Sequence, residues 1–299
     1  MPYDHRSPVI RPLPAALAAL VCAAALAGCG TSPEAARGSQ GPAAAAATTT
    51  APSRTPAGAP ASASAATAAA RPLAGRTVVV DPGHNPGNFR HVREINQKVD
   101  IGTARKECDT TGTSTNASGG KAAYTEAAFT LDVSHRLRDL LEARGATVVL
   151  THDADRPYGP CIDERARTGN GAKADAVVSV HADGSAKGHR GFHVIVPAKV
   201  KEGAADTGPI VAPSRALGER IAAAFRRATG TAPANYLGGG TGLDVRSDLG
   251  GLNLSTVPKV FVECGNMRDP MDAALLTSGV WRQKAAQGIA DGIVTYLQG

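Results

Sequence analysis

The sequence lacks the marks of several common protein classes. No basic run with interleaved aromatic residues occurs, which argues against a nucleic-acid-binding surface. The cysteine spacing does not resemble a zinc knuckle, and the His-Glu-x-x-His helix of most metallopeptidases is absent. The most apolar stretch, residues 12–25, is too short to span a bilayer as a mature helix. The sequence therefore gives no support to these classes.

The charge balance gives little support to an electrostatic partner. Half of the net charge of +6 lies in the first 72 residues, which contain five arginines and two acidic residues. The residues that follow carry 27 basic and 24 acidic side chains. This excess is too small to indicate a nucleic-acid partner, although a slightly basic surface would suit an anionic cell wall or membrane.

Residues 1–28 are predicted to be a lipoprotein signal peptide. Arg6 and Arg11 precede the short apolar run, which ends in Leu26-Ala27-Gly28-Cys29. This order resembles the lipobox of bacterial lipoproteins, in which the chain is cut before the cysteine and the cysteine is acylated. We therefore expect an exported protein, anchored to the membrane through lipidation of Cys29 and facing the cell wall. The alternative is an ordinary secretory signal peptide with an incidental cysteine, which also implies export.

Residues 29–72 are predicted to be a disordered tether. The segment is rich in Ala, Thr, Pro and Ser and contains no aromatic residue. Such a composition cannot bury enough apolar surface to offset the loss of chain entropy on folding. The remaining residues, 73–299, are long enough for one domain with a sizeable core, and we expect them to form the catalytic domain of a monomer.

The three cysteines of this domain differ in their surroundings. Cys108 and Cys161 both lie in polar stretches that contain Gly or Pro, so in an oxidising compartment we expect them to form a disulfide. Cys264 follows an apolar run, which predicts a small buried core residue.

Short β-branched runs alternate with helical stretches throughout the domain. Continuous apolar strands separated by helices predict a sheet covered on both faces, hence a three-layer α/β/α sandwich. Two long stretches without periodicity, 85–124 and 197–213, are predicted to be functional or mobile loops. The predicted strands are 76–81, 147–150, 176–180, 191–196 and 259–263, and the predicted helices are 125–144, 162–172, 214–229 (with Ser214 as N-cap) and 278–297.

Three predicted strands end on side chains that are capable of catalysis. These are His84, His181 and Glu263. Because the carboxyl ends of strands in α/β sheets gather at one edge, where ligands bind, we expect the three side chains to converge. Glu126 joins them from the first turn of a helix, on the same stripe as Phe129. A carboxylate on an apolar stripe needs a partner, and a metal ion is one that suits it.

Two imidazoles and one carboxylate match the protein ligands of a catalytic zinc site, which keeps a further position for water. We therefore expect His84, Glu126 and His181 to bind Zn²⁺. Zinc lowers the pKa of its water from about 15.7 toward about 7 and polarises a carbonyl. Glu263 would then act as general base, taking the proton of the water and passing it to the leaving nitrogen.

The same residues resemble the zinc-dependent N-acetylmuramoyl-L-alanine amidases of the amidase-3 type. The resemblance runs from Arg76 to about Leu297 and rests on four motifs in the family's order. They are Val-Val-Asp-Pro-Gly-His at 79–84, Glu126 at the start of a long helix, Val-Ser-Val-His-Ala-Asp at 178–183 and Val-Glu-Cys-Gly-Asn at 262–266. The resemblance implies a mixed sheet of about six strands and the same metal ligands and catalytic glutamate. It also implies hydrolysis of the amide bond between N-acetylmuramic acid and L-alanine of peptidoglycan.

Other residues match the family less directly. Arg165 also fits a family pattern, as a structural or groove-lining residue, while Arg246 and His193 are candidate substrate contacts. The insertion that carries Cys108 resembles a subgroup with an extra hairpin beside or over the active site, and we hypothesise that it restrains activity. His152 is expected to be a surface group.

Two other functions stay open at this point. One is a zinc peptidase acting within the stem peptide of peptidoglycan, and the other is a catalytically silent lipoprotein that binds wall fragments. Retention of all four expected catalytic residues disfavours the silent protein. The preferred stem peptides and any regulatory partner are not indicated by the sequence.

Overall fold

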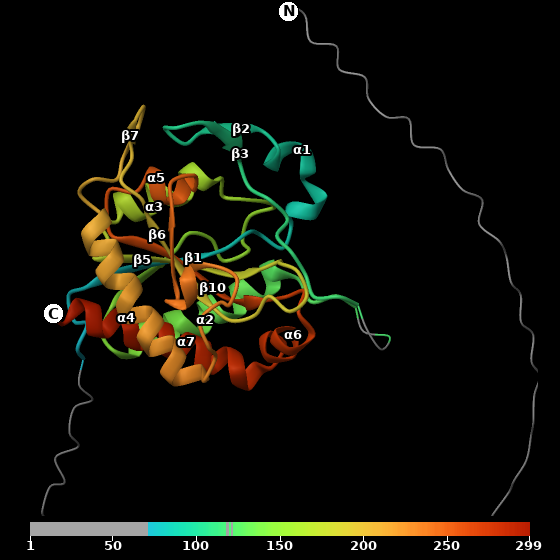
Figure 1. Ribbon diagram of the computed structural model, residues 1–299. Coiled ribbons are helices and arrows are strands. Elements are labelled where there is room, and N and C mark those ends of the chain that lie inside the picture. The colour runs from blue at the N-terminus through green and yellow to red at the C-terminus, as the bar shows by residue number, and fades with distance from the viewer. Residues whose placement is uncertain (1–70, 118–119, 121) are drawn as a thin grey trace, which may run out of the picture. The chain divides into compact units, whose positions relative to one another are not determined.

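A six-stranded mixed sheet forms the centre of the computed structural model, which describes residues 71–117, 120 and 122–299 (Figure 1). The strand order is β4-β1-β5-β10-β6-β9, in which β10 and β6 are antiparallel and the other neighbours are parallel. The strands are β1 (Thr77–Pro82), β4 (Thr147–Leu150), β5 (Ala176–Asp183), β6 (His193–Pro197), β9 (Leu243–Arg246) and β10 (Lys259–Asn266).

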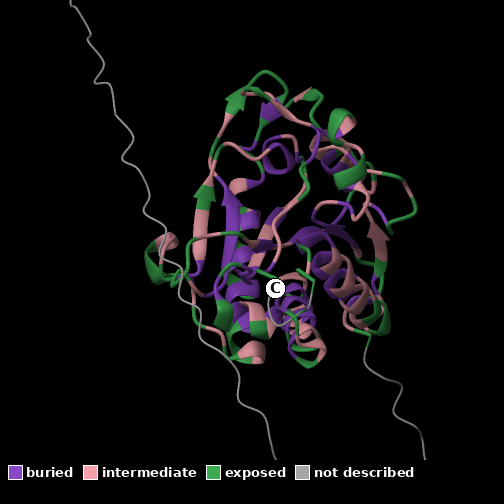
Figure 2. Cartoon of the chain, turned by 90° about the vertical axis from the view of Figure 1, so that its right-hand side faces the viewer, coloured by how far each residue is buried: buried purple, intermediate pink, exposed green. Residues whose placement is uncertain are grey.

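Helices cover both faces of this sheet, so the predicted three-layer sandwich is confirmed. The long helices α2 (Glu126–Ala143), α4 (Val211–Thr229) and α7 (Gly279–Leu297) pack on one face and on each other. The shorter helices α3 (Ile162–Gly171) and α5 (Gly250–Asn253) lie on the other face. Figure 2 shows the inner strands as largely buried, whereas the edge strands β4 and β9 are intermediate or exposed.

Side-chain alternation along the central strands decides what faces each layer. In β10, Val260, Val262 and Cys264 are fully buried in the main core with α4 and α7, so the free cysteine is a core residue as predicted. Phe261 and Glu263 point to the opposite face. The apolar layer and the functional side chains thus come from alternate positions of one strand.

Several elements differ from the sequence predictions. The stretch around 243–246 is a sixth strand at the sheet edge, and the two long loops each contain a hairpin, β2 (Lys98–Asp100) with β3 (Arg105–Glu107), and β7 (Lys201–Glu202) with β8 (Ala205–Asp206). Remaining short elements are η1 (Asn88–Arg90), α1 (Val92–Ile95), η2 (Gly238–Gly240) and α6 (Pro270–Leu276).

The predictions for Ser214 and His152 were wrong, because each side chain forms a hydrogen bond with a residue far away in the sequence. Helix α4 begins at Val211, one turn early, and Ser214 is no N-cap, since its hydroxyl accepts a hydrogen bond from the backbone N–H of Lys259. His152 is buried rather than on the surface, and its ring hydrogen-bonds to the carbonyl of Pro82.

The N-terminal predictions fall outside the described residues. This holds for the signal peptide, for the lipidation site Cys29 and for all but the last two residues of the tether. Among the helices of the described part, none combines the length and the apolar character needed to cross a membrane.

Candidate metal and catalytic site

The carboxyl ends of β1 and β5 bring together the residues that the sequence singled out. His84 follows β1, His181 lies near the end of β5, and Glu126 is the first residue of α2. Helix α2 packs on the face of the sheet opposite to the one that carries Glu263, and its N-terminus reaches the carboxyl ends of the strands. Thr125 caps this helix by accepting a hydrogen bond from the N–H of Ala128, which fixes where Glu126 begins the helix.

Three donor groups converge at this edge. Glu126 Oε2 lies 3.1 Å from His84 Nε2, and Glu126 Oε1 lies 3.0 Å from His181 Nδ1. One ligand atom from each residue can be chosen so that all lie within 4.8 Å of one another, close enough to hold a metal ion. Gly83 is required here, because a Cβ at this position would come within 2.3 Å of the His181 ring.

The environment keeps Glu126 ionised. Burial alone would raise the pKa of its carboxyl group, but the adjacent His84 and His181 rings outweigh burial and hold the pKa well below its usual range. The carboxylate also accepts hydrogen bonds from the backbone N–H groups of Thr113 and Ala182. The buried carboxylate and the two imidazoles together form a set of metal ligands that fits a divalent cation.

The second ring nitrogen of His84 is held by the loop after Cys108. His84 Nδ1 lies 3.1 Å from the carbonyl oxygen of Thr110 and 3.1 Å from its hydroxyl. Because a carbonyl can only accept, Nδ1 carries a proton, and Nε2 is the ring nitrogen that faces Glu126. Burial would lower the pKa of His84, but Glu126 and Asp109 outweigh burial and raise it to about 10.

Glu263 stands beside the metal-ligand group without a partner of its own. It pairs in register with His181 on the parallel neighbour β5 and with His193 on the antiparallel neighbour β6. Its Oε2 is buried and has no hydrogen-bond partner among the described residues. Burial, with Glu126 and Asp183 nearby, raises its pKa well above the usual carboxyl value. Such a carboxylate is suited to take up a proton.

The two candidate substrate contacts lie on the far side of Glu263. His193 is 2% exposed, and its Nδ1 is another buried atom without a hydrogen-bond partner in the described residues. Burial lowers its pKa. Arg246 ends β9 and pairs with Asp248 at 2.7 Å, with more than a third of its side chain exposed.

Arg165 belongs to a buried charged network below the site. Its guanidinium donates to Asp81 Oδ1 (2.7 Å), Asp109 Oδ2 (2.9 Å) and three backbone carbonyls, those of Pro82, Pro160 and His84. These five contacts use all five N–H donors of an arginine. Arg165 is therefore a structural residue, with no donor left for a substrate.

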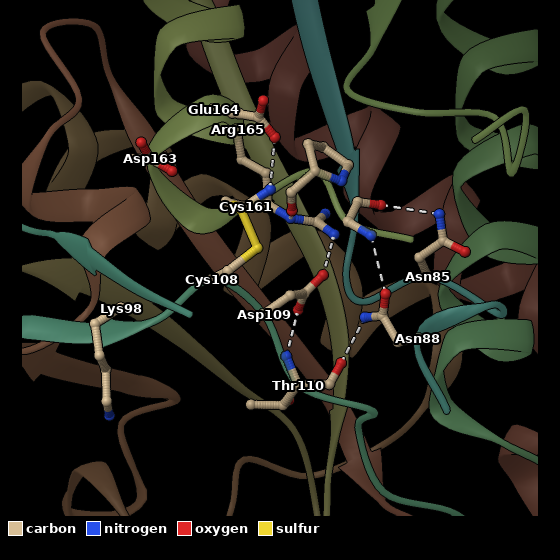
Figure 3. Close-up of a disulfide and its surroundings, with 12 residues drawn as sticks. Asn85, Asn88, Lys98, Cys108, Asp109, Thr110, Cys161, Asp163, Glu164 and Arg165 are labelled. Carbon is tan, nitrogen blue, oxygen red and sulfur yellow. Dashed lines mark hydrogen bonds and ion pairs between the residues drawn. A yellow bond between two sulfur atoms is a disulfide. The ribbon is translucent and has the colours of Figure 1, made fainter. Parts of the chain in front are cut away.

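A disulfide joins Cys108 to Cys161, next to this network (Figure 3). Cys161 precedes α3, the helix that carries Arg165, and Cys108 precedes Asp109. The bridge thus fastens the long insertion to α3 at the point where the insertion meets His84.

A cavity of about 260 Å³ opens beside the two histidines. One wall is the hairpin residues Lys106 and Glu107, and another is the segment 248–251 after Arg246. Lys106 and Asp248 form an ion pair of 3.1 Å between these walls. The insertion therefore contributes a side of the cavity, beside the site.

Comparison with known proteins agrees with this geometry. A family model described as N-acetylmuramoyl-L-alanine amidase matches residues 78–295. The chain belongs to the amidase-3 family. The amidase Rv3717 of Mycobacterium tuberculosis is 40% identical over 226 residues, which cover 75% of this chain and 88% of that protein.

Solved structures of amidase-3 enzymes have the same fold. Ami1 of Mycobacterium smegmatis superposes with a TM-score of 0.67 at 38% identity, covering 75% of this chain and 98% of that one. The apo form of Ami1 from Mycobacterium abscessus gives a TM-score of 0.67 at 40% identity, covering 75% and 100%. The mixed six-stranded sheet with helices on both faces is thus the family architecture.

Three residues around the amidase site escaped the sequence analysis. Asp109 and Lys259 belong to the charged network, and Tyr236 donates a hydrogen bond of 2.7 Å to Asp183 beside Glu263. A signal existed only for Asp109, as the carboxylate adjacent to a cysteine that was expected to be paired. Lys259 opens an apolar strand and Tyr236 lies in a Gly-rich stretch, so neither stood out.

Proposed function

We propose that this amidase-3 protein is a zinc-dependent N-acetylmuramoyl-L-alanine amidase that cuts peptidoglycan between the lactyl group of N-acetylmuramic acid and L-alanine. One juxtaposition carries the proposal: Glu263 lies in register beside His181, close to the group formed by His84, Glu126 and His181, and its buried Oε2 has no hydrogen-bond partner among the residues that the structure describes. The names of the relatives support the substrate class.

In this proposal His84, Glu126 and His181 hold the ion, with His84 binding through Nε2. When bound, zinc supplies Lewis acidity, which polarises a carbonyl oxygen and makes water ionise near neutral pH. Glu263 takes a proton from the attacking water and delivers it to the amide nitrogen. The water oxygen bonds to the carbonyl carbon and the C–N bond breaks, so that the lactyl group is left as a carboxylate and the stem peptide leaves with a free amine.

The raised pKa of Glu263 suits both proton transfers. A carboxyl group of ordinary pKa would be too weak a base near neutral pH, whereas a buried one holds the proton longer and can donate it to the leaving nitrogen. His193 and Arg246 lie on the side of Glu263 that is away from His84 and His181, and we assign them to substrate contact.

We further propose that residues 1–28 direct export, that Cys29 is acylated, and that residues 29–72 tether the catalytic domain of residues 73–299 to the membrane. Peptidoglycan is then within reach of an anchored monomer. Mass spectrometry of the mature protein tests the anchor, because a diacylglycerol-linked Cys29 is expected at its N-terminus.

The proposal is tested by zinc content and by products formed from muropeptides, for the wild-type protein and for His181→Ala. We expect one equivalent of zinc and release of intact stem peptide, both lost in the variant. Bound zinc with cleavage inside the peptide would indicate a peptidase instead. Absence of both zinc and hydrolysis in the wild-type protein would refute the proposal.

A further inference from the structure

The loop after Cys108 contacts His84 from the side opposite Glu126. Thr110 accepts the Nδ1 proton of His84, and the carboxylate of Asp109 lies 3.6 Å from the same nitrogen. That separation is too long for a hydrogen bond but short for a charge contact. Protein groups therefore contact both ring nitrogens of His84 and fix the orientation of the ring before any ion binds.

Asp109 holds the loop in place through both of its oxygens. Oδ1 accepts a hydrogen bond of 2.7 Å from the N–H of Thr110, and Oδ2 accepts one of 2.9 Å from Arg165. Asn88 supports the same loop, because its amide donates to the Thr110 carbonyl at 2.7 Å (Figure 3). The Thr110 carbonyl is therefore held in the direction from which His84 needs its acceptor.

Arg165 closes the arrangement from the other end. The nitrogen that binds Asp109 also donates a hydrogen bond of 3.0 Å to the backbone carbonyl of His84. His84 has φ of 63°, a left-handed conformation that is unfavourable for a non-glycine residue. One guanidinium thus fixes the backbone of His84 and, through Asp109, its ring.

The disulfide covalently links the loop that carries Asp109 to the helix that carries Arg165. Cys108 is adjacent to Asp109, and Cys161 lies one helical turn before Arg165. The backbone carbonyl of Cys108 also accepts a hydrogen bond of 2.7 Å from Ile162, at the start of α3. The segments of Asp109 and Arg165 are therefore joined twice, by the disulfide and by the ion pair between the two side chains.

We propose that Asp109, held by Arg165 and by the Cys108–Cys161 disulfide, is a positioning residue that fixes the orientation of His84 for metal binding. This inference rests on the proposed zinc-dependent function. Residues that orient a metal-binding histidine typically affect metal affinity by about 10- to 100-fold. We expect the same range here.

The test is zinc affinity, measured by competition with a chelator, on metal-free wild-type protein and three variants. Asp109→Ala should weaken zinc binding by about 10- to 100-fold. Asp109→Asn keeps the shape and the acceptor for Thr110 but loses the charge toward Arg165, so a smaller loss is expected. The matched control is Glu94→Gln, which changes a partly exposed carboxylate of the same insertion that lies beside His91 and outside the cavity walls. Its affinity should stay within about twofold of wild type.

A second readout separates positioning from a merely structural role. In ¹H–¹⁵N correlation spectra of the zinc-loaded wild-type protein, His84 should bind metal through Nε2 and keep a protonated Nδ1, and this signature should broaden or shift in the Asp109 variants. The pair variant Cys108→Ser/Cys161→Ser should weaken zinc binding in the same direction while circular dichroism shows it folded.

The outcomes separate this inference from the proposed function. Tight zinc binding by wild type and an unchanged dissociation constant in folded Asp109→Asn and in the cysteine pair variant would overturn the positioning role and leave the amidase proposal standing. Failure of the wild-type protein itself to bind zinc would overturn both. If Asp109→Ala does not fold, the decision rests on Asp109→Asn and the pair variant.

Discussion

Asp81 and Glu263 lie on the same face of the central sheet, but their carboxylates differ in how many hydrogen-bond partners they have. Asp81 has four side-chain partners, since Oδ1 binds Arg165 and Thr151 and Oδ2 binds Ser179 and Lys259. These use all the acceptor positions that a carboxylate offers. Glu263, in contrast, has a buried oxygen without a partner in the described part of the chain.

The difference teaches which buried charges maintain the fold and which are available for chemistry. A buried carboxylate without a partner is costly, so a protein retains one where the unused oxygen has a task. The partners of Asp81 hold its pKa well below the usual value, whereas burial raises that of Glu263. The first is locked as an anion, while the second can exchange a proton.

The largest expected effect comes from removing the unpartnered carboxylate. Glu263→Gln keeps size and burial but abolishes proton transfer, so kcat for muropeptide hydrolysis should fall by about 10²- to 10⁴-fold. Zinc content should remain at one equivalent. Thermal unfolding should show no loss of stability, because no hydrogen bond to Oε2 is broken. Activity within a few-fold of wild type would rule out Glu263 as the base.

Asp81→Asn makes the same chemical change on the partnered carboxylate. It leaves the buried cations of Arg165 and Lys259 with less compensation, and breaking a buried ion pair by removing one partner costs about 3–5 kcal/mol. For a domain of this size that corresponds to a fall in Tm of roughly 2–4 °C per kcal/mol. Chemical denaturation measures the loss, with Glu263→Gln as the control that undergoes the same acid-to-amide change. Equal stability of the two variants would contradict the comparison.

The sequence predicted the reactive residues better than the residues that hold them. His84, His181 and Glu263 each end an apolar strand, and Glu126 lies on an apolar helix stripe, so local pattern was enough to place them at one edge. The partners of Asp81 come from four separate segments of the chain, and no local pattern links Thr151 or Lys259 to it.

The elements that were missed have a similar cause. Strand β9 at the sheet edge is only partly buried, and Asp244 and Arg246 interrupt its apolar pattern, so its four residues read as loop. The burial of His152 depends on the carbonyl of Pro82, some seventy residues away. Interactions of this kind are decided by the tertiary fold, and one sequence does not reveal them.

The pH dependence of stability sharpens the comparison further. Burial would raise the pKa of Asp81, but Lys259 and Arg165 outweigh it, and Arg165 does the same for Asp109, so both carboxyl groups have lowered pKa values. The unfolded chain titrates near about 3.9. The native state therefore binds these protons more weakly, and the stabilisation is present above about pH 4 and is lost as pH falls toward the native pKa values.

We therefore expect the free energy of unfolding of the wild-type protein to decline below about pH 4. In Asp81→Asn this decline should be shallower, because one of the titrating groups is gone. Denaturation curves collected across the acidic range measure both slopes. Parallel slopes in the two proteins would mean that Asp81 does not supply the acid-sensitive part of the stability.

The smallest effect is expected for an ion pair at the surface. Lys98 and Glu107 join the two strands of the hairpin next to the disulfide, and both side chains are more than 40% exposed. Water and salt screen such pairs, which typically contribute about 0–1 kcal/mol. Lys98→Gln should therefore leave the free energy of unfolding close to that of wild type, and any difference should vanish in high salt. A loss as large as that of Asp81→Asn would show that partners, and not burial, decide how much a charged residue contributes to this fold.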